Sequence, residues 1–100
     1  MVTNKQLKHL KKLAHHRKPV VTIGNAGLTS AVFDELDRSL DYHELLKIKI
    51  SAPDKIARET ITLSLCKRLK ADLVVAIGHV VAIYRPTNKK DHPPRISFPG

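Results

Sequence analysis

The amino-acid sequence predicts one compact domain of mixed α/β (α+β) class, with elements in the order helix, strand, helix, strand, helix, strand, strand. A chain of 100 residues has room for a single hydrophobic core. Hydrophobic residues make up 42% of the chain, which is enough for folding. Segments with helical spacing of apolar residues alternate with short β-branched runs. Helices between strands imply crossover connections, so we expect a four-stranded mixed sheet with the helices packed on it.

In the first half of the chain, leucines at helical spacing predict a helix over residues 3–16, which Pro19 ends. Residues 20–23 are a β-branched run and predict a short strand. A glycine-containing loop follows at residues 24–27. A second helix is expected from residue 29 or 30 to residue 41, with Val32, Leu36 and Leu40 on its apolar face.

In the second half, residues 45–51 alternate as in a half-buried strand, with Leu46, Ile48 and Ile50 on one side. Pro53 is suited to the first turn of a third helix, and residues 73–77 and 80–84 read as two strands joined at Gly78 and His79. The folded domain is therefore expected to span residues 1–86. Residues 87–100 form a proline-rich basic tail that we expect to be extended or flexible.

Charge is distributed unevenly along this basic chain. The formal net charge is +9, of which residues 1–18 carry +6 without a single acidic residue. Residues 19–43, which include the second predicted helix, carry −3. A basic surface of this kind is typical of proteins that dock on nucleic-acid phosphates, because each neutralised phosphate releases counterions. The asymmetry favours such docking over a charge that serves solubility alone.

The loop at residues 24–27 has the pattern Gly-x-x-Gly between a strand and a helix. Glycine permits a positive φ and close approach of another backbone, and a helix N-terminus favours an anion. RNA-binding KH domains use such a loop to clamp a few nucleotides. The same pattern also arises in turns that need glycine for geometry alone, so the loop gains weight from the lysines and arginine around it.

Several classes of function are not favoured. Cys66 is the single cysteine, which excludes an internal disulfide and fits a reducing cytoplasm, and no segment reads as a secretion signal or membrane span. The six histidines lack metal-ligand spacing. No nucleophile and base are placed together. We therefore expect a cytoplasmic protein, monomeric, with no enzymatic activity, cofactor, metal, membrane or small-molecule substrate.

Five blocks of the chain resemble one known family. These are Leu-Ala-His, Pro-Val-Val, Gly-x-x-Gly-Leu-Thr, His-Glu-Leu-x-Lys-x-Lys and Ile-Gly followed by Tyr-Arg-Pro, in that order between Gln6 and Pro86. They are similar to the YhbY-like family, whose members carry the CRM (chloroplast RNA splicing and ribosome maturation) domain. The resemblance implies a fold like the C-terminal domain of translation initiation factor three. It also implies binding to ribosomal RNA in precursors of the large ribosomal subunit.

The candidate RNA-binding residues are the loop and the surrounding cations: Gly24, Asn25, Ala26, Gly27, Lys5, Lys8, Lys11, Lys12, Arg17, Lys18, Lys47, Lys49 and Arg85. Related loops often carry a basic residue between the glycines, where this chain has Asn25 and Ala26, so charge must come from neighbours. Two alternatives stay open. One is a small DNA-binding architectural protein, and the other is a protein-interaction module that uses the acidic helix around residues 34–41 against basic ribosomal proteins.

Overall fold

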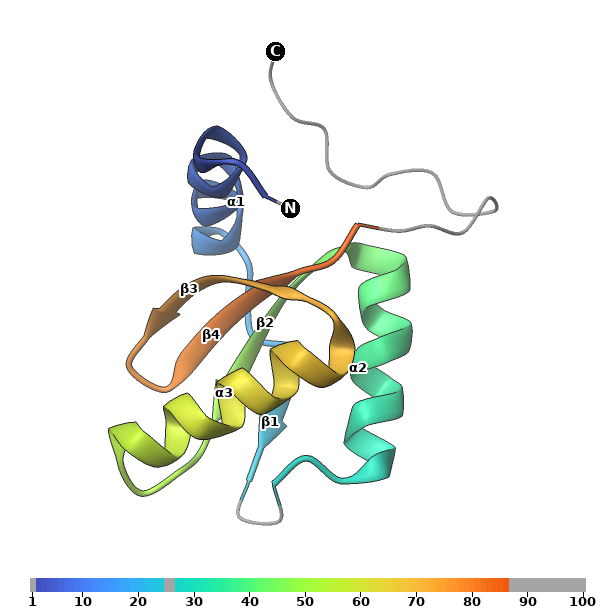
Figure 1. Ribbon diagram of the computed structural model, residues 1–100, viewed down its shortest axis with the longest axis vertical. Coiled ribbons are helices and arrows are strands. Elements are labelled where there is room, and N and C mark those ends of the chain that lie inside the picture. Colours follow the sequence, from blue (N-terminus) through green and yellow to red (C-terminus); the bar gives the residue numbers. More distant parts are fainter. Residues whose placement is uncertain (1, 25–26, 87–100) are drawn as a thin grey trace.

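The computed structural model describes residues 2–24 and 27–86, so Asn25, Ala26 and the predicted tail at 87–100 lie outside the described residues. The predicted order of elements is confirmed (Figure 1). The elements are α1 (Asn4–His15), β1 (Val21–Ile23), α2 (Ser30–His43), β2 (Leu45–Ile50), α3 (Lys55–Leu69), β3 (Asp72–Ile77) and β4 (Val80–Tyr84).

The four strands form one mixed sheet in the order β1-β2-β4-β3. β1 is parallel to β2, while β4 is antiparallel to both β2 and β3. The parallel pair results from the crossover through α2, and the antiparallel pair results from the two-residue turn between β3 and β4. The predicted mixed sheet is therefore confirmed, and β1 and β3 are its two edges.

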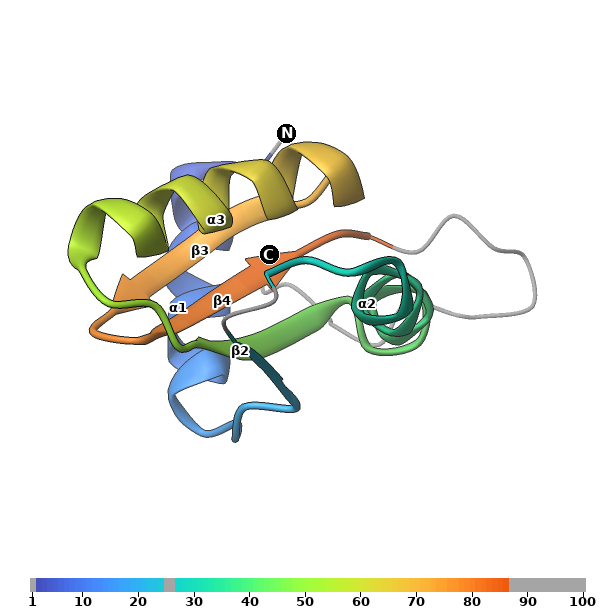
Figure 2. The same cartoon turned by 90° about the horizontal axis from the view of Figure 1, so that it is seen from below.

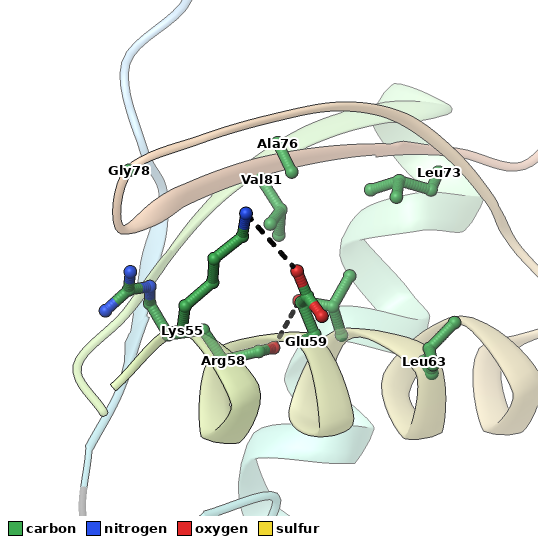
Figure 3. A pocket seen from close by; sticks show the side chains of 9 residues that line it. Lys55, Arg58, Glu59, Leu63, Leu73, Ala76, Gly78 and Val81 are labelled. Atoms are coloured by element: carbon green, nitrogen blue, oxygen red, sulfur yellow. Dashed lines mark hydrogen bonds and ion pairs between the residues drawn. The ribbon is translucent and has the colours of Figure 1, made fainter. Parts of the chain in front are cut away.

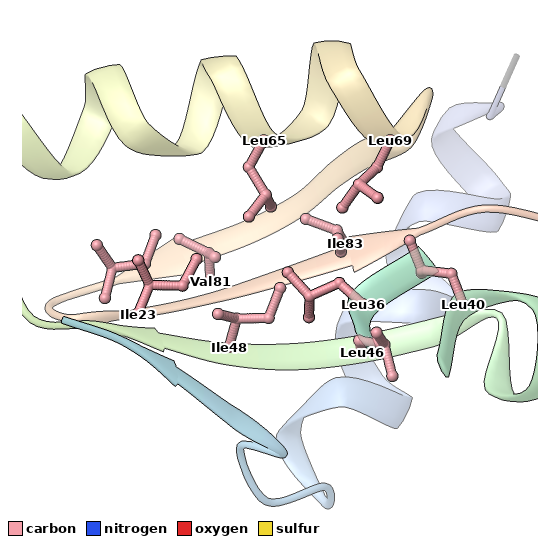
Figure 4. Packing of buried hydrophobic residues seen from close by; sticks show 10 residues of the cluster. Ile23, Leu36, Leu40, Leu46, Ile48, Leu65, Leu69, Val81 and Ile83 are labelled. Carbon is pink, nitrogen blue, oxygen red and sulfur yellow. The ribbon is translucent and has the colours of Figure 1, made fainter. Parts of the chain in front are cut away.

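Helices cover both faces of the sheet, which gives three layers (Figures 1 and 2). Leu46, Ile48 and Ile50 point from β2 towards α2 and α3, as the alternation predicts. They pack with α2 and α3 residues such as Leu36 and Leu65 (Figure 4). Leu45 points the opposite way and packs beneath α1 in a separate, smaller cluster. The sheet thus separates two hydrophobic cores.

Each helix begins at a side chain that satisfies a free first-turn N–H group. Thr3 and Gln6 form a reciprocal capping box at α1, in which each side chain accepts from the other's backbone nitrogen. The Thr29 hydroxyl accepts from the Val32 nitrogen at α2, and the Asp54 carboxylate accepts from the Ala57 nitrogen at α3. These caps explain why α1 and α2 start where the sequence predicts. Pro53, which was expected in the first turn of the third helix, instead lies just before the Asp54 cap.

The second helix continues two residues beyond its predicted end. α2 runs to His43 and stops at Glu44, which has a φ of 66° and donates its backbone N–H to the Leu40 carbonyl. A positive φ reverses the chain sharply, as at many helix C-termini. Leu45 can therefore enter β2 directly, with no intervening loop. Within the described residues no helix is long and apolar enough to cross a membrane.

Candidate nucleic-acid interface

The cationic side of α1 faces solvent. Leu10 and Ala14 are buried against the sheet, which directs the rest of the helix surface outward. The four predicted lysines of the helix are all exposed, and so is Lys18 in the segment that follows. The lysines of α1, which are Lys5, Lys8, Lys11 and Lys12, together with Lys18 are named the α1 basic surface below.

Two further predicted lysines lie on the same face of the sheet as α1. Lys47 and Lys49 alternate with the core residues of β2 and share their side with Leu45, which α1 covers. Lys49 is exposed and lies opposite Thr22 of β1, whereas Lys47 is half-buried. Lys49 therefore extends the basic surface across the sheet towards its β1 edge.

A pair of hydrogen bonds fixes the segment after α1 against β2. The Arg17 guanidinium donates from Nη1 to the Leu45 carbonyl at 2.8 Å. The Lys47 ammonium donates from Nζ to the Arg17 carbonyl at 3.0 Å. Both side chains are half-buried, so part of their role is to hold the chain where it leaves the helix. Their remaining N–H groups can still donate outward, because Arg has five donors and Lys has three.

The two glycines of the predicted loop differ in conformation. Gly27 has a φ of 71° and donates its N–H to the Gly24 carbonyl at 3.0 Å, so a turn requires glycine there. Gly24 has no positive φ, and a Cβ built on it would meet nothing within 4 Å. Geometry alone therefore does not explain Gly24, whereas an approaching backbone would.

The loop lies at the carboxyl end of β1, close to the end of β2. The Ser51 nitrogen donates to the Ile23 carbonyl at 2.8 Å and joins the two strand ends. Because Thr22 and Lys49 are register partners next to this end, the loop adjoins the cations of β2. In Figure 1 this end of β1 lies at the opposite end of the molecule from α1, so the loop and the lysines of α1 are separate parts of the predicted set.

Arg85 requires a correction to the predicted set. Its side chain is only 17% exposed, and its guanidinium is bound by internal partners. Nη1 donates to the Asp37 carboxylate at 2.8 Å and to the Leu69 carbonyl at 2.9 Å, while Nη2 donates to the Asp37 carbonyl at 2.8 Å and the Asp41 carboxylate at 3.1 Å. This arrangement ties the end of β4 to α2 and α3. We therefore remove Arg85 from the candidate RNA contacts.

The acidic side of α2 is also not uniformly free. Asp37 and Asp41 are four residues apart, so they share one side of the helix and both reach Arg85. Asp34 and Glu35 remain exposed. The sequence did carry a signal for this ion-pair network: two aspartates at helical spacing and an arginine at the end of a later strand. Counting charges by segment did not reveal it.

Two aromatic residues, Tyr84 and Phe33, are wholly or partly withdrawn from solvent. Tyr84 is 7% exposed and packs beneath α1. Burial, followed by the nearby Glu44 and Asp72 carboxylates, raises the pKa of the Tyr84 phenol. Phe33 packs against the larger core, and the Arg68 guanidinium carbon lies 5.1 Å from its ring centroid. The surface around α1 is therefore suited to phosphates more than to stacked bases.

The candidate metal ligands and the single thiol were also located in the structure. In residues 2–24 and 27–86, no three His, Cys, Asp or Glu side chains lie close enough together to hold an ion. Cys66 is half-buried against the larger core, and burial, followed by Asp72, raises the pKa of its thiol. A raised pKa lowers the fraction of reactive thiolate, so Cys66 is best described as a small packing residue.

Fold and surface together define a small three-layer α/β protein with a basic face. Comparison with known proteins then identifies its family: the model of the CRS1/YhbY (CRM) domain matches residues 2–85. The chain belongs to this family, as its sequence blocks predict.

Several relatives support that placement. A Haemophilus influenzae protein named RNA-binding protein is 39% identical over 88 residues, which cover 88% of this chain and 89% of the relative. Probable RNA-binding protein PA4753 of Pseudomonas aeruginosa is 38% identical over 88 residues, with 88% and 85% covered. The solution structure of Staphylococcus aureus SAV1595, described as a hypothetical protein and candidate RNA-binding protein, has a TM-score of 0.81 and 27% identity, with 99% and 100% covered.

Proposed function

We propose that this protein binds ribosomal RNA in precursors of the large ribosomal subunit, acting by binding and not by catalysis. The observation that carries the proposal is the α1 basic surface, which presents five exposed lysines, with the exposed Lys49 on the sheet face that α1 partly covers. The relatives named as RNA-binding proteins support RNA as the class of ligand. Assembly precursors follow from the family resemblance of the sequence blocks.

The chemistry of the surface favours a structured RNA. Lysine ammonium groups neutralise phosphates without reading the bases, so they position the protein on a folded backbone. The buried Tyr84 leaves the face beneath α1 without that ring for stacking. Backbone N–H groups at the start of α2 add donors where the loop ends. A protein of this kind recognises RNA by shape and phosphate spacing.

The test is sedimentation of the native protein with ribosomal particles from cell lysate at increasing salt. We expect co-migration with large-subunit precursors that is lost as salt rises, because counterion release drives the binding. A variant with Lys8, Lys11 and Lys12 changed to Gln is expected to stay at the top of the gradient. The matched control changes Arg38, Lys67 and Lys70 to Gln, which removes the same charge from α2 and the end of α3, and it is expected to co-migrate.

Three results would contradict the proposal. The native protein staying at the top of the gradient at low salt would exclude the ribosomal particle. Equal loss in both triple variants would mean that net charge, and not the α1 basic surface, drives binding. Duplex DNA bound as tightly as structured RNA in a titration of the purified protein would favour the architectural DNA-binding alternative.

A further inference from the structure

On the opposite side of the sheet from α1, a groove of about 530 Å³ lies between α3 and the β3–β4 hairpin (Figure 3). Leu63 of α3 and Leu73 of β3 form its walls, with Ala76 and Val81 between them. The same region carries two large apolar side chains that are well exposed: Leu63 is 69% exposed and Leu73 is 42% exposed. Aliphatic side chains clustered at a surface hollow are typical of protein-binding sites.

The strand beside the groove is an edge of the sheet. β3 pairs with β4 on one side, and no other strand of the described residues pairs with its outer side. Its outward backbone N–H and C=O groups are therefore a template for an added strand. Grooves between an edge strand and a helix are used for this kind of peptide binding, in which main-chain hydrogen bonds supply affinity and pockets supply specificity.

Apolar side chains are exposed on both faces of this one strand. Ala76 lines the groove on the α3 side, so its neighbour Ile77 points to the α1 side, where it is 71% exposed. An added strand alternates its side chains in the same way and would cover both Leu63 and Ile77 at once. A ligand held only in the groove would leave Ile77 uncovered.

One end of the groove is positively charged. Lys55 and Arg58 line it together with Gly78, at the end where the Ile50 nitrogen donates to the His79 carbonyl and brings the start of α3 to the hairpin. Glu59 is the acid in this lining, and it lies 4.0 Å from the Lys55 ammonium as an exposed pair. Acidic groups on a ligand would be attracted to this end.

We propose that the outer edge of β3 and the adjacent groove bind an extended apolar segment of a protein partner, with acidic residues at the Lys55–Arg58 end. An antiparallel strand would enter with its N-terminal residues at Gly78, so the acids precede the apolar stretch. A second copy of this chain is disfavoured by its net charge of +9 and by the bulge at Val74, which shortens the regular edge. The proposal does not depend on RNA binding.

The test uses a fluorescent peptide with an acetylated N-terminus and an amidated C-terminus. Its sequence is two acidic residues followed by a five-residue stretch in which valine and threonine alternate. Binding is followed by anisotropy and by backbone amide shifts, which are expected at residues 72–77 and along α3. Leu63→Ser is expected to weaken binding about tenfold, as truncation of a central apolar contact commonly does. Ile56→Ser is the matched control, because Ile56 is 76% exposed on the same helix but does not line the groove.

The charged end is tested separately. Arg58→Gln is expected to weaken binding about threefold, a typical effect of one partly exposed charge pair, whereas Lys67→Gln elsewhere on α3 is expected to have no effect. Amide spectra of each variant confirm folding. The proposal is overturned by absence of peptide binding to the native protein, by equal effects of Leu63→Ser and Ile56→Ser, or by an RNA oligonucleotide that shifts residues 72–77 and displaces the peptide.

Discussion

The two faces of the sheet use the same four strands for different purposes. On one face, α2 and α3 bury a ten-residue cluster that includes the inward side chains of β1, β2 and β4. On the other, α1 buries six residues near one end of the sheet and leaves Lys49 uncovered. The difference teaches that the larger core supplies most of the stability, while the smaller core positions a cationic helix. Substitutions on the two faces should therefore separate stability from binding.

The largest expected effect is on stability, at the larger core. Leu65→Ala is expected to lower the free energy of unfolding by about 3 kcal/mol, because Leu65 is fully buried and the packed neighbours collapse only partly into the space. Urea denaturation measures this value. The fold around β2 and β4 should remain recognisable in amide spectra, because nine other residues of the cluster are unchanged.

The matched change on the other face is Leu10→Ala, which also removes a fully buried leucine. Here we expect α1 to open locally at lower free energy than α2 or α3, since fewer buried residues hold it. Hydrogen exchange of the α1 amides reports this opening. Equal hydrogen-exchange protection of the three helices in the native protein would contradict the idea that the smaller core contributes less stability than the larger one.

A smaller effect, about 2 kcal/mol of unfolding free energy, is expected for Arg85→Gln. The substitution removes ion pairs to Asp37 and Asp41 that are only partly exposed to solvent, together with a hydrogen bond to the Leu69 carbonyl. RNA affinity should be unchanged. Arg38→Gln, at an exposed position on α2, is the control and should change stability by less than about 0.5 kcal/mol. A loss of RNA affinity with unaltered stability would return Arg85 to the RNA-binding surface.

Arg85 also shows what sequence reasoning can reach. The element order and the mixed sheet follow from local periodicity, because Leu46, Ile48 and Ile50 alternate and the helices carry apolar stripes. A charge count treats every arginine alike. Whether the Arg85 guanidinium is available to RNA is decided by Asp37 and Asp41, which are 48 and 44 residues away in the sequence. The groove beside β3 was not predicted, because its lining residues come from α3, β3 and β4 and meet only in the folded chain.

An effect of about 1 kcal/mol is expected at the loop, where the two glycines should behave differently. Gly27→Ala places a Cβ on a residue with a φ of 71° and should destabilise the protein by about 1 kcal/mol. Gly24→Ala should leave stability unchanged, because nothing lies within 4 Å of the added carbon. We expect Gly24→Ala to weaken RNA binding if another backbone approaches there. Urea denaturation and RNA titration of both variants measure the contrast, and unaltered RNA binding by Gly24→Ala would reduce the loop to a turn.

The smallest effect is a pH dependence that originates beneath α1. Burial, followed by Glu44 and Asp72, raises the pKa of the Tyr84 phenol above its ordinary value of 10.0. An acid with a raised pKa in the folded state contributes stability that is fully present below the unfolded pKa and is lost as pH rises through the folded pKa. The native protein should therefore lose stability above pH 10, and Tyr84→Phe should lose less over the same range. Urea denaturation on both sides of pH 10 compares the two slopes. It is done in a Cys66→Ala background, because the pKa of the Cys66 thiol is also raised. Identical slopes would mean that Tyr84 ionises as readily in the folded protein as in the unfolded chain, and that α1 shields the smaller core less than its packing indicates.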